Sequence, residues 1–403
     1  MKASHVLGCR HCGTIQATPD RHRGVLDCAA CGVGLERFTG RSLDAALAIS
    51  VAALLLLLPA NALTFITTSL FSAEEHSRLI SSTTVLWRQG WPVLAIAICL
   101  FTVILPIVRF SLLTAALGAL RLGWRDAWIG PVFRWSNALQ TWAMADVFLL
   151  AFLVAYARLA ATITVELGPG AICFIAAGVL TLLSRATLDK KAVWKLIAPQ
   201  AAVDVCQPVL SCEACELLVP ATQAKRPCPR CGRRLLARKT DAVARATAYT
   251  LAGAVFYAPA NILPFATIPI NLQPTAYNII GGVHDLLEAG LYGLALLVFL
   301  ASFLIPVLKL TAIAWFIYSV RAHSSRKLVF KTRLYQLVDE IGRWSMVDPL
   351  TVAAFVPVVR YNTLLTARAE AAAPFFTGVV IFTILAAKSF DPRLIWDVSE
   401  QTA

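Results

Sequence analysis

Eight apolar runs, each long enough to cross the hydrocarbon core of a bilayer, set the strongest limit on what this chain can fold into. They lie near residues 43–66, 92–120, 142–165, 170–187, 245–268, 288–320, 344–366 and 374–390. With 58% hydrophobic and only 15% charged residues, the chain is far too apolar for a soluble protein of this size. It is therefore predicted to be an integral membrane protein.

The eight runs form two sets of four that repeat the same landmarks. Three of these recur at offsets of 200 or 202 residues: PAN at 59–61 and 259–261, FTVILPIVRF at 101–110 with ASFLIPVLKL at 301–310, and WAMAD at 142–146 with WSMVD at 344–348. A tandem duplication explains this order. Because an even number of spans returns the chain to its starting side, the predicted fold class is an all-α polytopic membrane protein with two parallel four-helix transmembrane units.

Prolines and mixed basic and apolar segments modify the simple spans. Pro59 and Pro259 each remove a backbone donor and are predicted to kink or end the first span of a unit near the external face. In the second unit the chain is then expected to leave the membrane as irregular structure at Pro264, Pro269 and Pro274. Three segments are predicted to be helices lying on the inner leaflet: VFRWSNALQTW at 132–142, DKKAVWKLIAP at 189–199 and RLYQLVDEIGRW at 333–344.

The distribution of lysine and arginine predicts the orientation. The N-terminal segment, the central linker and the other segments on their side hold 29 of these residues, whereas the segments on the opposite side hold 5. The positive-inside rule then places both termini and the linker in the cytoplasm. A basic excess of this kind is typical of cytoplasmic loops beside anionic lipid, so no nucleic-acid partner is predicted. The N-terminus MKASHVLGCRHCG lacks the apolar core of a cleavable signal peptide.

Eight of the 11 cysteines form two sets of paired CxxC motifs. The sets are Cys9, Cys12, Cys28 and Cys31, then Cys212, Cys215, Cys228 and Cys231. Two such knuckles, separated by 15 or 12 residues, can present four thiolates tetrahedrally to one Zn²⁺. A redox dithiol or disulfide is the alternative, which a cytoplasmic location disfavours. The sequence predicts two structural zinc ions, each coordinatively closed and without a catalytic role.

The predicted domains follow from the cysteine sets and the spans. They are zinc ribbon 1 at 1–40, transmembrane unit 1 at 41–198, a linker with zinc ribbon 2 at 199–240, and transmembrane unit 2 at 241–403. Each small ribbon is expected to be cytoplasmic and directly precedes a first span. It is a folding brace or a docking platform for another protein, and the residues leave both interpretations open.

Each unit also carries one acid and one base inside its apolar runs. These are Arg109 and Asp146 in the first unit, and Lys309 and Asp348 in the second. A charge at that depth costs roughly 2.5 to 3.5 kcal/mol, so the two signs within a unit are predicted to pair. The pair is either a structural brace or part of a functional polar site.

The second unit is the more polar of the two around its pair. Ser302 lies seven residues before Lys309 and so on the same helical face, and Ser345 lies three residues before Asp348. Thr383 of the last span is expected to join them. Lysine, unlike arginine, can lose its proton in a membrane, so a site that handles a proton or a polar headgroup is predicted in the second unit.

No enzymatic motif stands out. The chain has no G-x-x-x-x-G-K-[ST] phosphate-binding loop, no H-E-x-x-H motif and no Ser-His-Asp arrangement. Neither catalysis nor an ATPase of its own is predicted.

The chain resembles the paraquat-inducible protein A family in its paired CxxC ribbons and in the motifs PAN, IPVLKL, WSMVD and KSFDPRLIW. The two-unit, single-chain form is similar to the branch of lipophilic envelope-spanning tunnel protein A. The resemblance implies a multi-pass protein of the bacterial inner membrane that partners a periplasmic MCE-domain tunnel protein. It further implies the movement of membrane phospholipids between the inner membrane and that tunnel.

Two other functions stay open on the residues alone. One is a sensor or assembly scaffold in which the ribbons recruit cytoplasmic partners and the spans only anchor them. The other is a proton-coupled exporter of small amphiphiles. Lipid held inside the second bundle would favour transport, whereas a solid apolar bundle would favour the scaffold.

Overall fold

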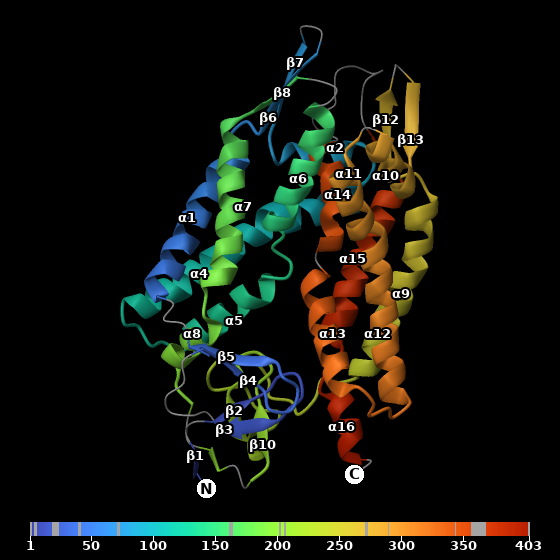
Figure 1. Ribbon diagram of the computed structural model, residues 1–403. Helices are drawn as coiled ribbons and strands as arrows, with labels where there is room; N and C mark the ends of the chain where they lie inside the picture. Colours follow the sequence, from blue (N-terminus) through green and yellow to red (C-terminus); the bar gives the residue numbers. More distant parts are fainter. Residues whose placement is uncertain are drawn as a thin grey trace.

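The computed structural model describes residues 2–401 apart from 4–5, 18–23, 39–41, 71–72, 161–163, 201–202, 205–206, 271–272, 289, 343 and 356–367. A helix lies in each of the eight apolar runs (Figure 1). Short strands occupy the two ends of the molecule. The fold is therefore mostly helical, as predicted, with small β-structures at both ends.

The first repeat contains a helix in each of its four apolar runs. The helices are α1 (Leu43–Ala62), α3 (Pro92–Cys99) continued by α4 (Leu105–Arg121), α6 (Ala145–Ala160) and α7 (Pro169–Thr187). Helix α1 packs against α4 and α7, and α6 packs against α7.

The second repeat follows the same order. Its corresponding helices are α9 (Ala242–Ile262), α11 (Tyr292–Phe299) continued by α12 (Ile305–Arg321), α14 (Val347–Phe355) and α15 (Ala372–Ser389). Helix α9 packs against α12 and α15. The remainder of the seventh predicted run, from residue 356, lies outside the described residues.

Within the described residues, five helical segments are long and apolar enough to cross a membrane. They are Leu43–Ala62, Pro92–Arg121, Pro169–Thr187, Tyr292–Arg321 and Ala372–Ser389. Helix α6 is apolar but shorter. Several such helices in one chain make this a multi-pass membrane protein.

The long second span of each repeat contains one π-helical turn. It covers Leu100–Ile104 in the first repeat and Leu300–Leu304 in the second, directly before the turn that carries Pro106 or Pro306. A proline supplies no backbone N–H, and a widened turn is one way for a helix to absorb that loss. In the second repeat this turn carries Ser302, whose side chain is buried.

The PAN motifs end the first span of each repeat, as predicted. Pro59 and Pro259 lie in the last turn of α1 and α9, and the chain then enters a β-strand. The amide of Asn61 donates to the carbonyl of Leu57 at 2.7 Å, and the amide of Asn261 donates to that of Tyr257 at 2.9 Å. These bonds hold each asparagine side chain against the last turn of its own helix.

Two three-stranded sheets follow these helix ends, and sequence patterns did not predict them. The first has the order β7 (Ala73–Ser77), β6 (Ile66–Leu70), β8 (Thr164–Leu167), and the second has the order β13 (Gln273–Tyr277), β12 (Ala266–Ile270), β14 (Arg368–Ala369). The irregular structure predicted around Pro269 and Pro274 is therefore wrong. Pro269 pairs with Pro274 across the hairpin, next to the terminal pair Ile270 and Gln273. Residues paired at this position of an antiparallel hairpin make no hydrogen bonds to each other, so the missing N–H of proline costs no ladder bond.

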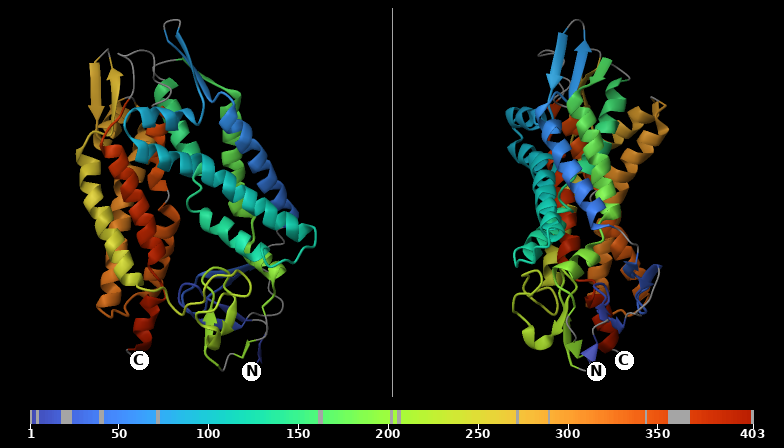
Figure 2. Two further views of the ribbon diagram at one scale, coloured as in Figure 1. Left: turned by 180° about the vertical axis from the view of Figure 1, so that it is seen from behind. Right: turned by 90° about the vertical axis from the view of Figure 1, so that its left-hand side faces the viewer.

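The three segments predicted to lie on a membrane surface are helical. They form α5 (Ile129–Leu139), α8 (Lys190–Ile197) and α13 (Leu328–Ile341), while α16 (Leu394–Gln401) occupies the place of α8 in the second repeat. Both hairpins, β6–β7 and β12–β13, lie at one end of the molecule, and both chain termini lie at the other (Figures 1 and 2). That α5, α8 and α13 lie on a lipid surface stays a prediction.

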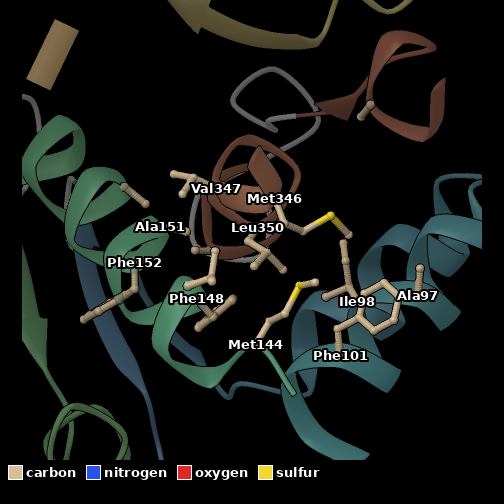
Figure 3. Packing of buried hydrophobic residues seen from close by; sticks show 14 of the residues in the cluster. Ala97, Ile98, Phe101, Met144, Phe148, Ala151, Phe152, Met346, Val347 and Leu350 are labelled. Atoms are coloured by element: carbon tan, nitrogen blue, oxygen red, sulfur yellow. The ribbon is translucent and has the colours of Figure 1, made fainter. Parts of the chain in front are cut away.

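The two repeats share one hydrophobic core through α6 and α14. Phe148 and Ala151 of α6 lie against Leu350 of α14, with Met144 and Met346 close by (Figure 3). All five side chains are buried. Methionine is unbranched and fills irregular gaps, which suits a contact between two helices that are similar in sequence but not identical.

Candidate metal and polar sites

The first ribbon comprises residues 6–38 and gathers four buried thiols. Cys9 and Cys12 lie between β2 (Val6–Gly8) and β3 (Ile15–Ala17), and Cys28 and Cys31 lie between β4 (Gly24–Asp27) and β5 (Gly34–Phe38). The sulfur atoms of Cys9 and Cys31 are 3.6 Å apart, and those of Cys12 and Cys28 are 3.5 Å apart. All four sulfurs lie within 4.8 Å of one another.

The second ribbon, residues 209–234, repeats this arrangement. Strands β10 (Val209–Ser211) and β11 (Leu218–Pro220) flank Cys212 and Cys215. The sulfur atoms of Cys212 and Cys231 are 3.6 Å apart, as are those of Cys215 and Cys228. Again all four thiols are buried and lie within 4.8 Å of one another.

Both sets fit a tetrahedral metal ion. Four thiolates at the usual zinc–sulfur distance would lie about 3.8 Å apart, close to the observed separations. The residue after each knuckle has a positive φ, namely Gly13 at 85°, Gly32 at 68°, Glu216 at 57° and Gly232 at 69°. Its N–H donates to the carbonyl of the first cysteine at 2.8 Å in every case. The backbone is therefore already wrapped around each position that a metal would occupy.

His11 lies beside the first set but is no part of it. Its ring is buried, and burial together with the neighbouring Arg10 guanidinium lowers the pKa of His11 to about 4. It is therefore neutral at physiological pH. The chain can bind two metal ions through cysteine alone, because each set already supplies four ligands.

Each ribbon packs against the repeat that it does not directly precede. The cysteine cluster of the first ribbon packs against Trp396 of α16, in the second repeat. The cysteines of the second ribbon share a core with Phe133 of α5 and Trp194 of α8, in the first repeat. The approach is closest at Gly130, where a Cβ atom would lie 1.9 Å from the carbonyl oxygen of Arg230. The ribbons thus tie the two repeats together at the end opposite the hairpins.

In the second repeat the structure brings together part of the predicted polar site. Lys309 is 2% exposed, and its Nζ donates to the Thr383 hydroxyl at 2.9 Å and to the carbonyl of Gly342 at 3.1 Å. The segments that carry Ser302 and Ser345 contact each other, and both hydroxyls are buried without a hydrogen-bond partner among the described residues. The side chain of Asp348 lies outside the described part of the chain.

In the first repeat the acid of the predicted pair has a basic partner that was not predicted. Asp146 is buried and pairs with Arg185 of α7, with Nη2 and Oδ2 3.2 Å apart, and it also interacts electrostatically with Arg109. The guanidinium of Arg109 lies 4.8 Å from the ring centre of Phe110, and its Nη1 has no hydrogen-bond partner among the described residues. The predicted structural counterpart pair, Arg109 with Asp146, is thus joined by a second cation, Arg185, from another helix.

Sequence reasoning missed Arg185, although a signal was present. Arginine is rare inside an apolar run, and this one lies in the last turn of α7, level with the start of α6. The residue 202 positions later is Ala387, so the cation is specific to the first repeat. A comparison of the two repeats position by position would have singled it out.

The FDPR segment of the second repeat has a structural role. Asp391 accepts hydrogen bonds from the guanidinium of Arg393 at 2.8 Å and from the backbone N–H of Lys239 at 3.1 Å. Burial opposes ionisation of Asp391, but the bonds from Arg393 outweigh it and lower the pKa of Asp391 below its usual range. The carboxylate therefore fastens the end of α15 to the segment between the second ribbon and α9.

Known proteins resemble the chain over most of its length. The intermembrane transport protein PqiA of Escherichia coli K12 is 29% identical over 405 residues, which covers 98% of this chain and 96% of that protein. Lipophilic envelope-spanning tunnel protein A of the same bacterium is 29% identical over 271 residues, or 67% of this chain and 63% of that protein. A probable intermembrane transport protein of Haemophilus influenzae is 27% identical and covers 78% of each chain.

No solved structure matches the chain significantly. The family model of paraquat-inducible protein A matches residues 43–198 and again residues 243–400, so that both repeats are covered. The motifs PAN, IPVLKL and KSFDPRLIW, on which the resemblance rested, lie within these two ranges. The chain therefore belongs to the paraquat-inducible protein A family.

Proposed function

We propose that this protein is the inner-membrane component of an MCE-type lipid transport system and moves phospholipids between the inner membrane and a periplasmic MCE-domain tunnel protein. The observation that carries the proposal is similarity over nearly the whole chain to proteins named for intermembrane transport. A buried polar cluster inside an otherwise apolar helical bundle supports it, since an intramembrane polar site is expected where a headgroup or proton passes. The role is transport without catalysis.

The proposed architecture is two parallel four-helix units, at 41–198 and 241–403, each preceded by a cytoplasmic ribbon. The excess of lysine and arginine in the terminal and linker segments supports a cytoplasmic location for both termini. The two hairpin sheets, at the opposite end of the molecule, then face the periplasm and the tunnel protein (Figure 1). Each ribbon holds one structural Zn²⁺, because closed four-cysteine sites leave no position for a substrate.

Cysteine labelling in intact cells tests this orientation. A membrane-impermeant thiol reagent should label a cysteine introduced at Asn278 or at Arg78, next to Ser77, because both positions are exposed and lie directly after the hairpins. It should not label one introduced at Gln200, between α8 and the second ribbon, until the cells are opened. Labelling at Gln200 in intact cells would contradict the orientation.

The proposed intramembrane site is in the second unit and consists of Lys309, Asp348, Ser302, Ser345 and Thr383. The bond from Lys309 to Thr383 and the two buried hydroxyls without partners support it. Such hydroxyls are free to bind a polar group that enters the bundle, since leaving them unsatisfied costs free energy. We assign the Lys309–Asp348 pair and these hydroxyls to the handling of a lipid headgroup or a proton.

Transfer of a labelled lipid tests the function itself. Proteoliposomes that contain the chain and a fluorescent phospholipid are mixed with a purified periplasmic MCE-domain protein, and lipid arriving on the acceptor is measured. The proposal predicts transfer that depends on both proteins. Transfer no faster than from protein-free liposomes, with the chain folded and correctly inserted, would favour the scaffold instead.

A further inference from the structure

A cleft of about 650 Å³ lies where the two ribbons meet the two repeats. Arg10 of the first ribbon and Glu216 of the second line it. So do Arg134 of α5, Lys190 of α8 and Lys388 of α15. The crossed packing of the ribbons creates this space, because it brings parts of all four modules to one place.

The lining of the cleft carries more positive than negative charge. Seven lysine or arginine side chains line it, against four aspartate or glutamate side chains. Three of the acids are already neutralised within the protein. Glu216 lies 2.6 Å from Lys191, Glu213 lies 2.7 Å from Arg233, and Asp339 lies 3.4 Å from Lys388.

Two cations remain without an acidic partner. Among the described residues, neither Arg134 nor Lys190 forms an ion pair. Lys190 donates to the neutral side-chain oxygen of Gln140 at 2.7 Å, and the guanidinium of Arg134 lies 5.6 Å from the ring centre of Trp135. Arg185, which pairs with Asp146, lines the same cleft, and its Nε is buried without a hydrogen-bond partner in the described part of the chain.

The electrostatics of Lys190 agree with an unneutralised cationic site. Its side chain is accessible to solvent through the cleft. Even so, the surrounding protein and then the nearby cations, Arg10 first among them, lower the pKa of Lys190 to about 8. A bound anion would offset this repulsion and favour the charged lysine.

We propose that this cleft binds a phosphate group. Arginine presents a planar fork of donors that matches phosphate oxygens, and lysine adds a compact charge, so Arg134 and Lys190 together suit a phosphoryl anion. The uncharged donors Asn137 and Thr141 line the same wall and suit the hydroxyls of a larger phosphorylated molecule. The phosphate belongs to an anionic lipid headgroup of the adjacent leaflet or to a soluble phosphorylated compound. The site is independent of the proposed transport site.

The test is calorimetric titration of the full chain, in nanodiscs of phosphatidylcholine, with inorganic phosphate. Saturable binding is expected, and the double variant Arg134→Gln with Lys190→Gln should weaken it by about tenfold or more, because two charge-assisted contacts are removed. Arg185 is left unchanged, since its loss would strand Asp146. Lys190→Gln alone changes one solvent-accessible side chain and should weaken binding in the same direction without disturbing the fold.

The matched control is Arg121→Gln. Arg121 ends α4 outside the cleft and pairs with Asp44 at 2.5 Å, so this variant removes the same charge elsewhere. Its Kd should stay within about twofold of wild type, since exposed ion pairs contribute little. No saturable binding by the wild type, or equal weakening in Arg121→Gln and Lys190→Gln, would overturn the proposal.

A second titration identifies the source of the phosphate group. Nanodiscs that also contain phosphatidylglycerol should suppress the binding of inorganic phosphate if a lipid headgroup occupies the cleft. Unchanged binding in these nanodiscs assigns the cleft to a soluble phosphorylated compound. Both results require the wild-type site to bind phosphate in the first titration.

Discussion

Replacing Lys309 with alanine is expected to lower the free energy of unfolding by roughly 3 to 5 kcal/mol, the usual cost of leaving one partner of a buried ion pair alone. Lys309 is 2% exposed and hydrogen-bonds only neutral groups among the described residues, Thr383 and the carbonyl of Gly342. The proposed acidic partner is Asp348, so Asp348→Ala should destabilise the protein to a similar extent. Thermal unfolding in one detergent measures both variants.

The double variant Lys309→Ala with Asp348→Ala separates a pair from two independent charges. If the two side chains form a pair, the double variant should recover much of the stability that either single variant loses, because no orphan charge remains. Arg109→Gln is a control from the equivalent position of the first repeat, where the guanidinium lies over Phe110. Additive losses in the double variant would contradict the Lys309–Asp348 pair.

Metal removal is expected to have the largest effect on folding. Structural zinc contributes about 10 to 16 kcal/mol of apparent binding free energy to small cysteine modules, far more than a ribbon of this size can gain from its own core. Purified chain should contain two zinc ions, one for each four-cysteine set. Elemental analysis of the intact, reduced protein measures this number directly.

Cys212→Ser should reduce the zinc content to one ion per chain and lower the yield of folded protein before it alters transport. The second ribbon shares a core with α5 and α8, so its unfolding would expose the base of the first repeat. Cys99→Ser is the matched control, because Cys99 lies in a span outside both cysteine sets. One zinc ion or none in the wild type, or two in Cys212→Ser, would refute the assignment.

The helices and the cysteine sets were predictable because each leaves a strong local signal. An apolar run of about 20 residues has few alternatives to a membrane helix. The two CxxC pairs are separated by short loops, so the chain itself brings Cys9 close to Cys31 and Cys212 close to Cys231. The PAN motifs predicted the ends of α1 and α9 for a similar reason, since a proline acts on its own helix.

The sheets and the crossed ribbons depend on contacts between distant segments and were not predictable. Strand β6 pairs with β8, almost 100 residues later, and neither has the alternating pattern of a long strand. The second ribbon packs closely on α5 because Gly130 leaves room for the backbone of Arg230, a fit between shapes that no pattern in one sequence reveals. The ion pair between Asp146 and Arg185 was missed for the same reason, because Arg185 reaches the acid from α7.

The proposed polar site of the second repeat is needed for lipid transfer, and transfer by the double variant tests this directly. Proteoliposomes with wild-type chain, with Lys309→Ala and Asp348→Ala combined, or with Arg109→Gln are compared at equal amounts of folded protein. Wild type and Arg109→Gln should transfer lipid to the MCE-domain acceptor, whereas the folded double variant should show only background transfer. Transfer by the double variant at the wild-type rate would contradict the account and leave Lys309 and Asp348 as a structural brace.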